Sequence, residues 1–188
     1  MINIKKLIVL LITFLVTIVA IFVALPSAVN LLGFSGEQFF GGELWRILTF
    51  PLTHATSAHL IENVVALFIV SLLMLEFKLS TKDTAYLFMG SSVLVAFVVG
   101  LILPSVIIVG ASLGLYALYG GLTIRGKEYV PLYITWGLIG IVIFLNFVYC
   151  IKYGTGLEQP IFHTIGFVAG VTFLGVKDKL KRKKRIFK

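Results

Sequence analysis

Long apolar runs dominate this sequence and limit what it can fold into. Six of them, separated by short connections, lie at residues 7–25, 57–77, 84–103, 110–124, 129–149 and 161–176. A helix needs about 20 predominantly apolar residues to cross a bilayer, and the longer runs reach that length. Hydrophobic residues make up 59% of the 188 residues and charged residues 13%, which leaves too little polar surface for a water-soluble domain. The sequence therefore predicts an all-α, multi-pass membrane protein in which residues 1–188 form a single domain of six transmembrane helices.

The basic residues are distributed asymmetrically about these runs. Of the 16 lysines and arginines, only Arg46 and Lys152 lie in the connections on one side, and all the others lie on the opposite side. Because cytoplasmic segments of membrane proteins carry the excess of Lys and Arg, residues 1–6 and the tail 177–188 are both predicted to be cytoplasmic. Six spans are consistent with two ends on the same side. We expect the protein in a prokaryotic cell membrane.

Both ends of the chain allow another interpretation. The first apolar run follows Lys5 and Lys6 and resembles a signal peptide, but it is longer than the apolar part of one, and its removal would upset the charge parity. The basic tail 177–188 could suggest nucleic-acid binding. A basic segment directly after a span is more simply explained by the orientation rule and by anionic lipid headgroups. We therefore predict contact with the lipid bilayer and no nucleic-acid partner.

Polar side chains within the spans are the candidates for function, because such residues are costly in a bilayer. Counted from the basic residue at the cytoplasmic end of each span, Ser112, His163 and Asn63 lie ~20–22 Å above the inner face at the rise of an α-helix. The hydrocarbon core is ~30 Å thick, so all three lie about 10 Å below the outer surface. His59 lies one turn above Asn63 on the same helix face.

The span that begins at Ser112 is too short to cross the bilayer. Its outer end is therefore expected inside the membrane, where non-helical backbone is tolerated only if it lines a water-filled cavity. The helix N-terminus there offers unpaired N–H groups and a positive dipole end that suit a developing oxyanion. A serine at this N-terminus, His163 at the same depth and polar donors on a third helix are the parts of a serine hydrolase.

Three segments together resemble the rhomboid family of intramembrane serine proteases, from about residue 40 to the tail. "ELWRILTFPLTHATSAHLIEN" resembles the family's Trp-Arg loop and His-x-x-x-Asn second helix, "GASLGLYALYG" its G-x-S-G segment with a following tyrosine, and "HTIGFVAG" its H-x-x-G-x-x-x-G sixth helix. The resemblance implies a six-helix bundle with a first loop partly embedded in the membrane and a short fourth helix. It also implies an active site that opens to the outer side.

The resemblance assigns roles to five residues. Ser112 would be the nucleophile and His163 its general base. The backbone N–H of Ser112 and the side chains of His59 and Asn63 would form the oxyanion hole. Tyr116 would pack against the imidazole of His163 and hold its orientation.

Other residues would support the site. Trp45 and Arg46 would belong to the embedded first loop, which accounts for an arginine on the outer side. His54 matches a histidine common at that point and is expected to be structural. The glycines Gly110, Gly166 and Gly170 would allow close approach, the last two bringing the sixth helix near the fourth.

The sequence departs from the family at two positions. Leu113 stands where the family usually has glycine directly after the serine, with Gly114 next, and its side chain could crowd the oxyanion region. Glu62 is unusual in the second helix, and it points about 100° away from the face that carries Asn63. A carboxylate that could complete a triad is not evident, since Glu158 is expected to be solvated in an outer loop. We therefore predict a Ser-His dyad.

Two other classes of function are compatible with parts of the sequence. One is a catalytically impaired rhomboid-like protein that binds membrane clients, although such proteins typically lose the serine or the histidine. The other is a zinc transporter or metalloprotease that uses the three histidines and Glu62. The chain has no His-Glu-x-x-His motif, and His54 and His59 do not share a helix face. The single Cys150 excludes a multi-cysteine metal site. We predict no metal and no cofactor.

The expected substrates are single-span membrane proteins. The resemblance implies that their helix unwinds near its outer end and carries a small residue before the scissile bond. It also implies that they reach the site between mobile helices, the second and fifth spans being the candidates.

Overall fold

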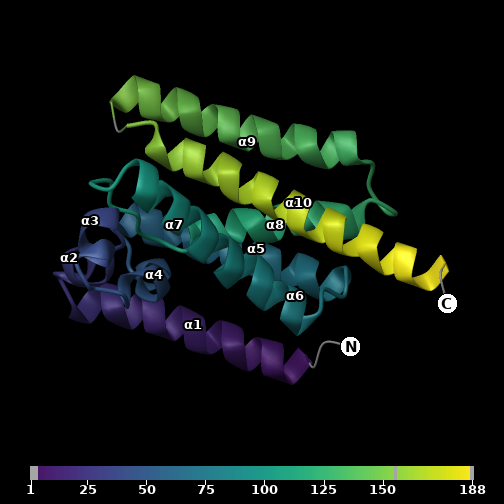
Figure 1. The fold of residues 1–188 in the computed structure, drawn as a ribbon, viewed down its shortest axis with the longest axis horizontal. Helices are drawn as coiled ribbons and strands as arrows, with labels where there is room; N and C mark the ends of the chain where they lie inside the picture. Colours follow the sequence, from purple (N-terminus) through teal and green to yellow (C-terminus); the bar gives the residue numbers. More distant parts are fainter. Residues whose placement is uncertain (1–3, 155, 187–188) are drawn as a thin grey trace.

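The computed structural model describes residues 4–154 and 156–186, and this part of the chain is almost entirely helical (Figure 1). The long elements are α1 (Ile4–Ala24), α5 (Ser57–Glu76), α7 (Ser91–Ile102), α8 (Ser112–Gly126), α9 (Leu132–Tyr153) and α10 (Glu158–Ile186). Within the described residues, β pairing is limited to one isolated bridge between Phe34 and Ile108. The prediction of an all-α protein is confirmed.

Short helices fill two of the connections. α2 (Ala28–Leu32), α3 (Gly36–Phe40), α4 (Arg46–Thr49) and the 3-10 turn η1 (Phe50–Leu52) lie between α1 and α5, whereas α6 (Thr81–Ala85) and the π-helical turn η2 (Tyr86–Gly90) lead into α7. In Figure 1, α2, α3 and α4 gather at one end of the molecule, and both ends of the chain lie toward the other. Following the predicted orientation, we call these the outer end and the inner end.

Four described helical stretches are long and apolar enough to cross a membrane. They are Ser57–Glu76, Thr81–Ile102, Leu132–Tyr153 and Glu158–Leu180, and a shorter apolar helix covers Ile8–Ala24. α8 has 15 residues, so it is shorter than a full span, in the place where the sequence predicts a short helix. These findings fit a multi-pass membrane protein, while the count of six spans stays a prediction.

Helix α8 lies in the middle of the bundle, and glycines let α10 approach it closely. Most of its side chains are buried, in contrast to a helix that faces lipid. A Cβ atom on Gly170 would collide with the carbonyl of Ala117, and one on Gly120 would collide with the carbonyl of Phe167. Small residues at such crossings are what allow membrane helices to pack backbone against backbone. This close packing fixes the position of α10 along the axis of α8.

Helix α9 lies at the edge of the bundle, with α10 and α8 as its main neighbours (Figure 1). Of its side chains only Cys150 is fully buried, and the exposed remainder is mostly apolar, as expected for a helix surrounded by lipid. One polar contact ties α9 to the inner half of α8. The indole N–H of Trp136 donates a hydrogen bond to Thr123 Oγ1 at 3.1 Å.

An arginine and a buried carboxylate stabilise the two ends of the bundle. At the outer end, the buried Arg46 donates to the carbonyls of Gly33 (2.7 Å) and Asn30 (2.8 Å) and pairs with Glu43. This network accounts for the arginine that the charge pattern leaves on the outer side, and it holds α2 against α4. Trp45 beside it is about half exposed, and its indole N–H donates to a carbonyl of α2.

At the inner end, Asp83 of α6 is buried and joins two neighbouring helices. Its carboxylate contacts the Lys177 ammonium of α10 and lies 3.6 Å from an Arg125 guanidinium nitrogen of α8. Arg125 also lies 3.2 Å from a carboxylate oxygen of Asp178. Ser80 caps α6 by accepting the N–H of Asp83 at 3.1 Å. We call Asp83, Arg125, Lys177 and Asp178 the inner ion network.

Candidate active site

A pocket of about 210 Å³ at the outer end brings together residues from α5, α8 and α10. It contains the predicted nucleophile Ser112, the predicted base His163 and the predicted oxyanion donor His59. The full lining consists of Ala55, His59, Ile107, Ile108, Val109, Ser112, Leu113, Glu158, Gln159, Phe162 and His163. Chain segments far apart in the sequence therefore meet in one pocket.

Ser112 is the first residue of α8, and the chain makes a sharp turn just before it. Gly110 has φ +91°, a conformation that side-chain-bearing residues rarely adopt, and its N–H donates to the Phe50 carbonyl at 3.0 Å. Ala111 is the N-cap of α8 and has no side chain that could accept a hydrogen bond from the first turn. The N–H groups of that turn are thus left available at the pocket.

His163 of α10 is held by an aromatic stack. Its ring lies over that of Tyr116 with the centroids 4.2 Å apart and the planes inclined by 11°. The imidazole is 5% exposed, and neither of its nitrogens has a hydrogen-bond partner among the described residues. One turn further along, Gly166 packs against the Leu113 carbonyl, where a Cβ would come within 2.6 Å. In this conformation Ser112 and His163 line one pocket without a hydrogen bond between them.

His59 enters the pocket from the first turn of α5. Thr56 caps this helix by accepting the His59 N–H at 3.1 Å. The imidazole lies directly against Gly110, since a Cβ there would be 2.6 Å from His59 Cε1 and 2.7 Å from Nε2. Glycine at position 110 is thus required both by the turn and by the space that His59 occupies. Nε2 of His59 is buried and has no hydrogen-bond partner among the described residues.

Asn63 is not brought to the pocket. Its side chain is buried, and its Nδ2 donates to the carbonyl of His59 within the same helix at 2.7 Å. Its Oδ1 is buried without a partner among the described residues. In this conformation the amide N–H group is used within the first turn of α5.

His54 lies behind His59, outside the membrane-spanning stretches. The two rings are 5.1 Å apart in an edge-to-face arrangement. Burial, and to a lesser degree the neighbouring His59, lowers the pKa of His54 to about 4. His54 is therefore neutral near pH 7 and packs against the ring of His59. Within the described residues, no group of three His, Cys, Asp or Glu side chains could hold a metal ion.

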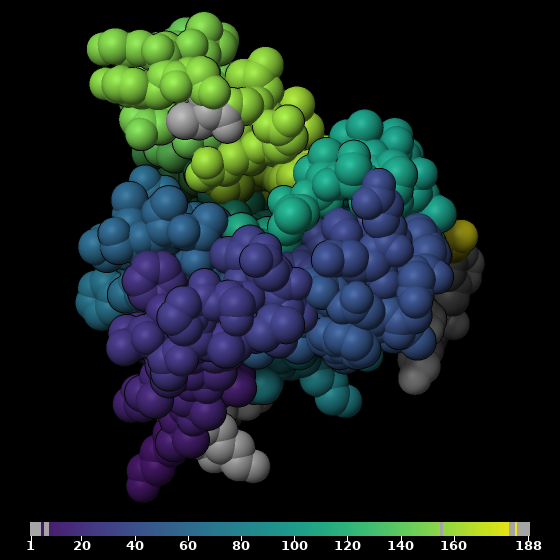
Figure 2. All heavy atoms as spheres, turned by 90° about the vertical axis from the view of Figure 1, so that its left-hand side faces the viewer, coloured from purple at the N-terminus to yellow at the C-terminus, as the bar shows by residue number. Residues whose placement is uncertain are grey.

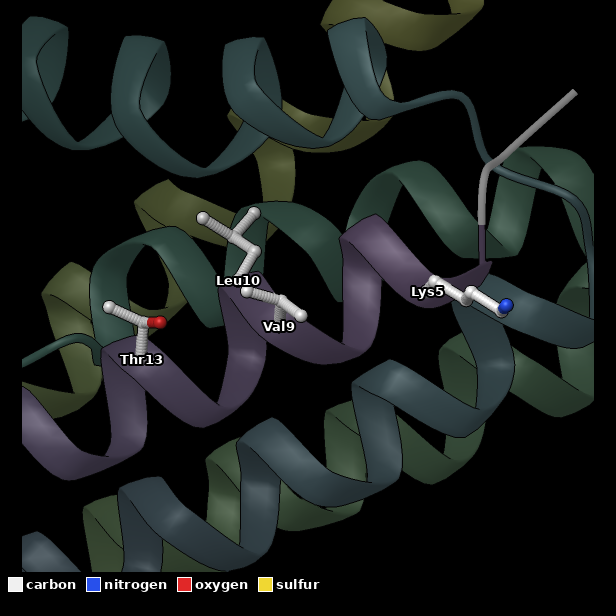
Figure 3. A pocket seen from close by; sticks show the side chains of 4 residues that line it. All are labelled: Lys5, Val9, Leu10 and Thr13. Carbon is white, nitrogen blue, oxygen red and sulfur yellow. The ribbon is translucent and has the colours of Figure 1, made fainter.

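A second hollow, of about 410 Å³, lies along α1 and has a different character (Figure 3). It is lined by Lys5, Val9, Leu10 and Thr13, all from one helix. It brings no second polar element opposite Lys5 or Thr13, so the outer pocket is the candidate active site.

Comparison with models of known families shows to which family the chain belongs. A model of the rhomboid domain matches residues 41–177, which is most of the sequence. The chain belongs to the rhomboid family. A search of curated proteins finds no significant match. The resemblance carried by the three sequence segments is thereby confirmed.

This rhomboid has pocket residues that the sequence did not single out. Ile107, Ile108 and Val109 form one wall, because the strand-like bridge between Ile108 and Phe34 holds that segment beside the N-terminus of α8. Gln159 and Phe162 of α10 also line the pocket. Both lie within one turn of His163 in the sequence, so the helical repeat around the histidine was a usable signal.

The two departures from the family are placed differently. Leu113 lines the pocket but is 2% exposed, and it packs in a core cluster with Phe34 and Phe50. Glu158 lies in the first turn of α10 and lines the pocket as an exposed residue. Glu62 is exposed on α5.

Proposed function

We propose that this rhomboid is an intramembrane serine protease that hydrolyses a peptide bond in or near the membrane segment of its substrates. One observation carries the proposal. Ser112 at the N-terminus of α8 and the buried, unpaired imidazole of His163 line the same pocket, and Tyr116 stacks on that imidazole. A serine beside a base held by a third group is the arrangement that activates a nucleophile.

In the proposed reaction, the neutral imidazole of His163 takes the proton of Ser112 as Oγ attacks the peptide carbonyl. The carbonyl oxygen becomes an oxyanion, which the N–H of Ser112 and the ring of His59 stabilise as donors. His163 then gives its proton to the leaving amine, and a water molecule hydrolyses the acyl enzyme by the same route. No third residue is needed, and Tyr116 replaces a carboxylate in holding the ring.

Asn63 can act as an oxyanion donor in this mechanism only after its side chain changes its hydrogen bond. As an oxyanion donor it has to release the His59 carbonyl and turn toward α8, since its Nδ2 is now used within α5. We propose that substrate binding drives this exchange, because a charged acceptor forms a stronger hydrogen bond than a carbonyl does.

The proposal includes the orientation of the protein in the membrane and the kind of substrate. Both ends of the chain lie in the cytoplasm, the basic tail contacts anionic headgroups, and the pocket opens to the outer side of the membrane. The substrate is a single-span protein whose helix unwinds near its outer end, and it approaches between α5 and α9. The enzyme works without metal or cofactor, so a chelator should leave its rate unchanged.

An inactive rhomboid that binds membrane clients is the competing function. The missing hydrogen bond between Ser112 and His163 is the observation in its favour. Catalytic hydrogen bonds are often long in proteins without substrate and shorten in the complex, so this geometry is also compatible with an active enzyme.

A labelling experiment separates the two. The purified protein is treated with a fluorophosphonate probe, which bonds only to an activated serine, and is tested for cleavage of a single-span reporter in the same detergent. We expect labelling and cleavage in the wild type and neither in Ser112→Ala. Ser71→Ala is the matched control, since that buried hydroxyl bonds only to a carbonyl of its own helix. A folded wild type that is neither labelled nor active would contradict the protease proposal.

A further inference from the structure

Glu62 is an exposed carboxylate within a helix that is long and apolar enough to span the membrane. The residues on either side of it along the surface of α5, Ile61 and Val65, are 62% and 52% exposed and face the lipid region. Glu62 forms no ion pair within residues 4–154 and 156–186. A charged side chain without a partner is costly in this environment and is a sign of function.

Glu62 lies on an exposed flank of α5, about 100° around the helix from the buried Asn63, and this flank borders α8. It lies three residues after His59, whose ring borders the pocket, and four residues before Ala66. The Ala66 carbonyl accepts a hydrogen bond from the Tyr119 hydroxyl of α8 at 3.4 Å. The Glu62 carboxylate also lies within Coulombic reach of the Tyr116 hydroxyl. Glu62 is thus next to the residues that hold His163, although it does not line the pocket itself.

An opening in the bundle adjoins this position. On α8, the half-buried residues Ser112, Tyr116 and Tyr119 follow one another along one stripe of the helix, between neighbours that are fully buried. Tyr119 donates to the Ala66 carbonyl of α5 and Tyr116 stacks on His163 of α10, so the stripe lies between α5 and α10, and α9 packs on the latter. Figure 2 views the outer end and shows a hollow between the blue part of the surface, which includes α5, and the green α9.

The charges around the opening have one sign. The pocket is lined by one ionised residue, the carboxylate of Glu158, and by no lysine or arginine. Arg46 is engaged by Glu43 and two carbonyls, and Lys152 lies over the ring of Tyr153. A cation that pairs with Glu62 therefore has to come from the molecule that enters the opening.

We propose that Glu62 is a specificity-determining residue that pairs with a lysine or arginine in the outer half of the substrate's membrane segment. This inference rests on the proposed function. The long apolar stem of such a side chain runs along the lipid-facing surface of α5 while its charged head reaches the carboxylate. The ion pair removes an unpaired charge from each partner and fixes the segment beside Tyr116 and Ser112. Membrane segments without a cation there bind more weakly.

The test uses single-span peptides that differ at one position, which carries lysine, methionine or glutamate and is moved stepwise through the outer half of the segment. Binding is measured by fluorescence anisotropy to Ser112→Ala, and cleavage is measured with the wild type. At one position we expect the lysine peptide to bind about five- to tenfold more tightly than the methionine peptide and to be cleaved with a correspondingly higher kcat/KM. Glu62→Gln, placed in both backgrounds, should abolish this preference, and Glu62→Lys should transfer it to the glutamate peptide.

Glu37→Gln is the matched control, since Glu37 is an exposed carboxylate of α3 at the same end and does not line the pocket. It should keep the lysine preference. Equal binding of the lysine and methionine peptides at every position, or a preference that survives Glu62→Gln, overturns the inference. A lysine preference in binding with no cleavage by the wild type supports the role of Glu62 and overturns the proposed protease function instead.

Discussion

At the inner end of the bundle, the buried carboxylate of Asp83 is matched by cations from α8 and α10. At the outer end, the rings of His163 and His59 and the amide of Asn63 carry buried atoms without hydrogen-bond partners among the described residues. Both ends place polar groups within helices that are otherwise apolar. They differ in whether the chain itself supplies the partners.

That difference separates stability from function. A buried polar group without a partner costs about 1–3 kcal/mol, so a cluster of them at one end indicates groups kept free for another molecule. Satisfied ion pairs between three helices instead hold the positions of α6, α8 and α10. Substitutions at the outer end should therefore change the rate of reaction, and substitutions in the inner ion network should change stability.

The largest expected effect is at the outer end, in the proposed dyad. Ser112→Ala and His163→Ala should each lower cleavage by at least about a thousandfold, because either change removes the activated nucleophile. Ser112→Ala should leave the melting temperature unchanged, whereas His163→Ala also removes a buried ring that stacks on Tyr116 and should lower it. The measurements are single-turnover cleavage and thermal unfolding of the same preparations. Cleavage by Ser112→Ala near the wild-type rate would contradict the assignment.

The oxyanion donors should have smaller effects than the dyad. His59→Ala is expected to slow cleavage by about ten- to a thousandfold, because the N–H of Ser112 remains as a donor. Asn63→Ala should slow it to a similar or lesser degree, since Asn63 has to leave its bond to the His59 carbonyl first. Single-turnover rates at saturating substrate report on this step. If only KM changed, the donor role would be wrong and His59 would act in binding.

Much of this outer end could be predicted from the sequence, because helix rise is constant. Counting residues from the basic ends gave Ser112 and His163 one depth, and both line one pocket. Counting along a helix does not give side-chain conformations. It therefore missed that Asn63 bonds to its own helix and that Leu113 packs inward.

The inner ion network was not predictable in the same way. Asp83 meets Lys177 across a sequence separation of 94 residues, and neither residue belongs to a motif. The two meet because α10 and the turn η2 that follows α6 both pack on α8. The sequence also left open where Arg46 finds its partners, which are mainly backbone carbonyls of α2 and the turn after it.

Leu113 lies at the boundary between the proposed reaction site and the hydrophobic core. Its side chain packs with Phe34 and Phe50, so Leu113→Gly should destabilise the protein by about 2–4 kcal/mol through the lost packing and the freer backbone. Turnover of the folded fraction should stay near the wild-type value. Activity and melting temperature of the same variant give the answer. Faster turnover would show that the leucine crowds the oxyanion region, as the departure from the family first suggested.

The smallest effect on the reaction should come from the inner end. Asp83→Asn removes the carboxylate that joins α6 to α8 and α10, and leaves Lys177 and Arg125 without it. Both cations are more than a quarter exposed, so solvent reduces the loss, and we expect about 1–3 kcal/mol of destabilisation. Cleavage per folded molecule should be unchanged, because Ser112 and His163 lie at the other end of the same two helices. High salt should weaken the wild-type network toward the variant. An Asp83→Asn protein that kept its melting temperature but lost activity would show that the two ends are coupled through α8 and α10, and that stability and function are not separated in this molecule.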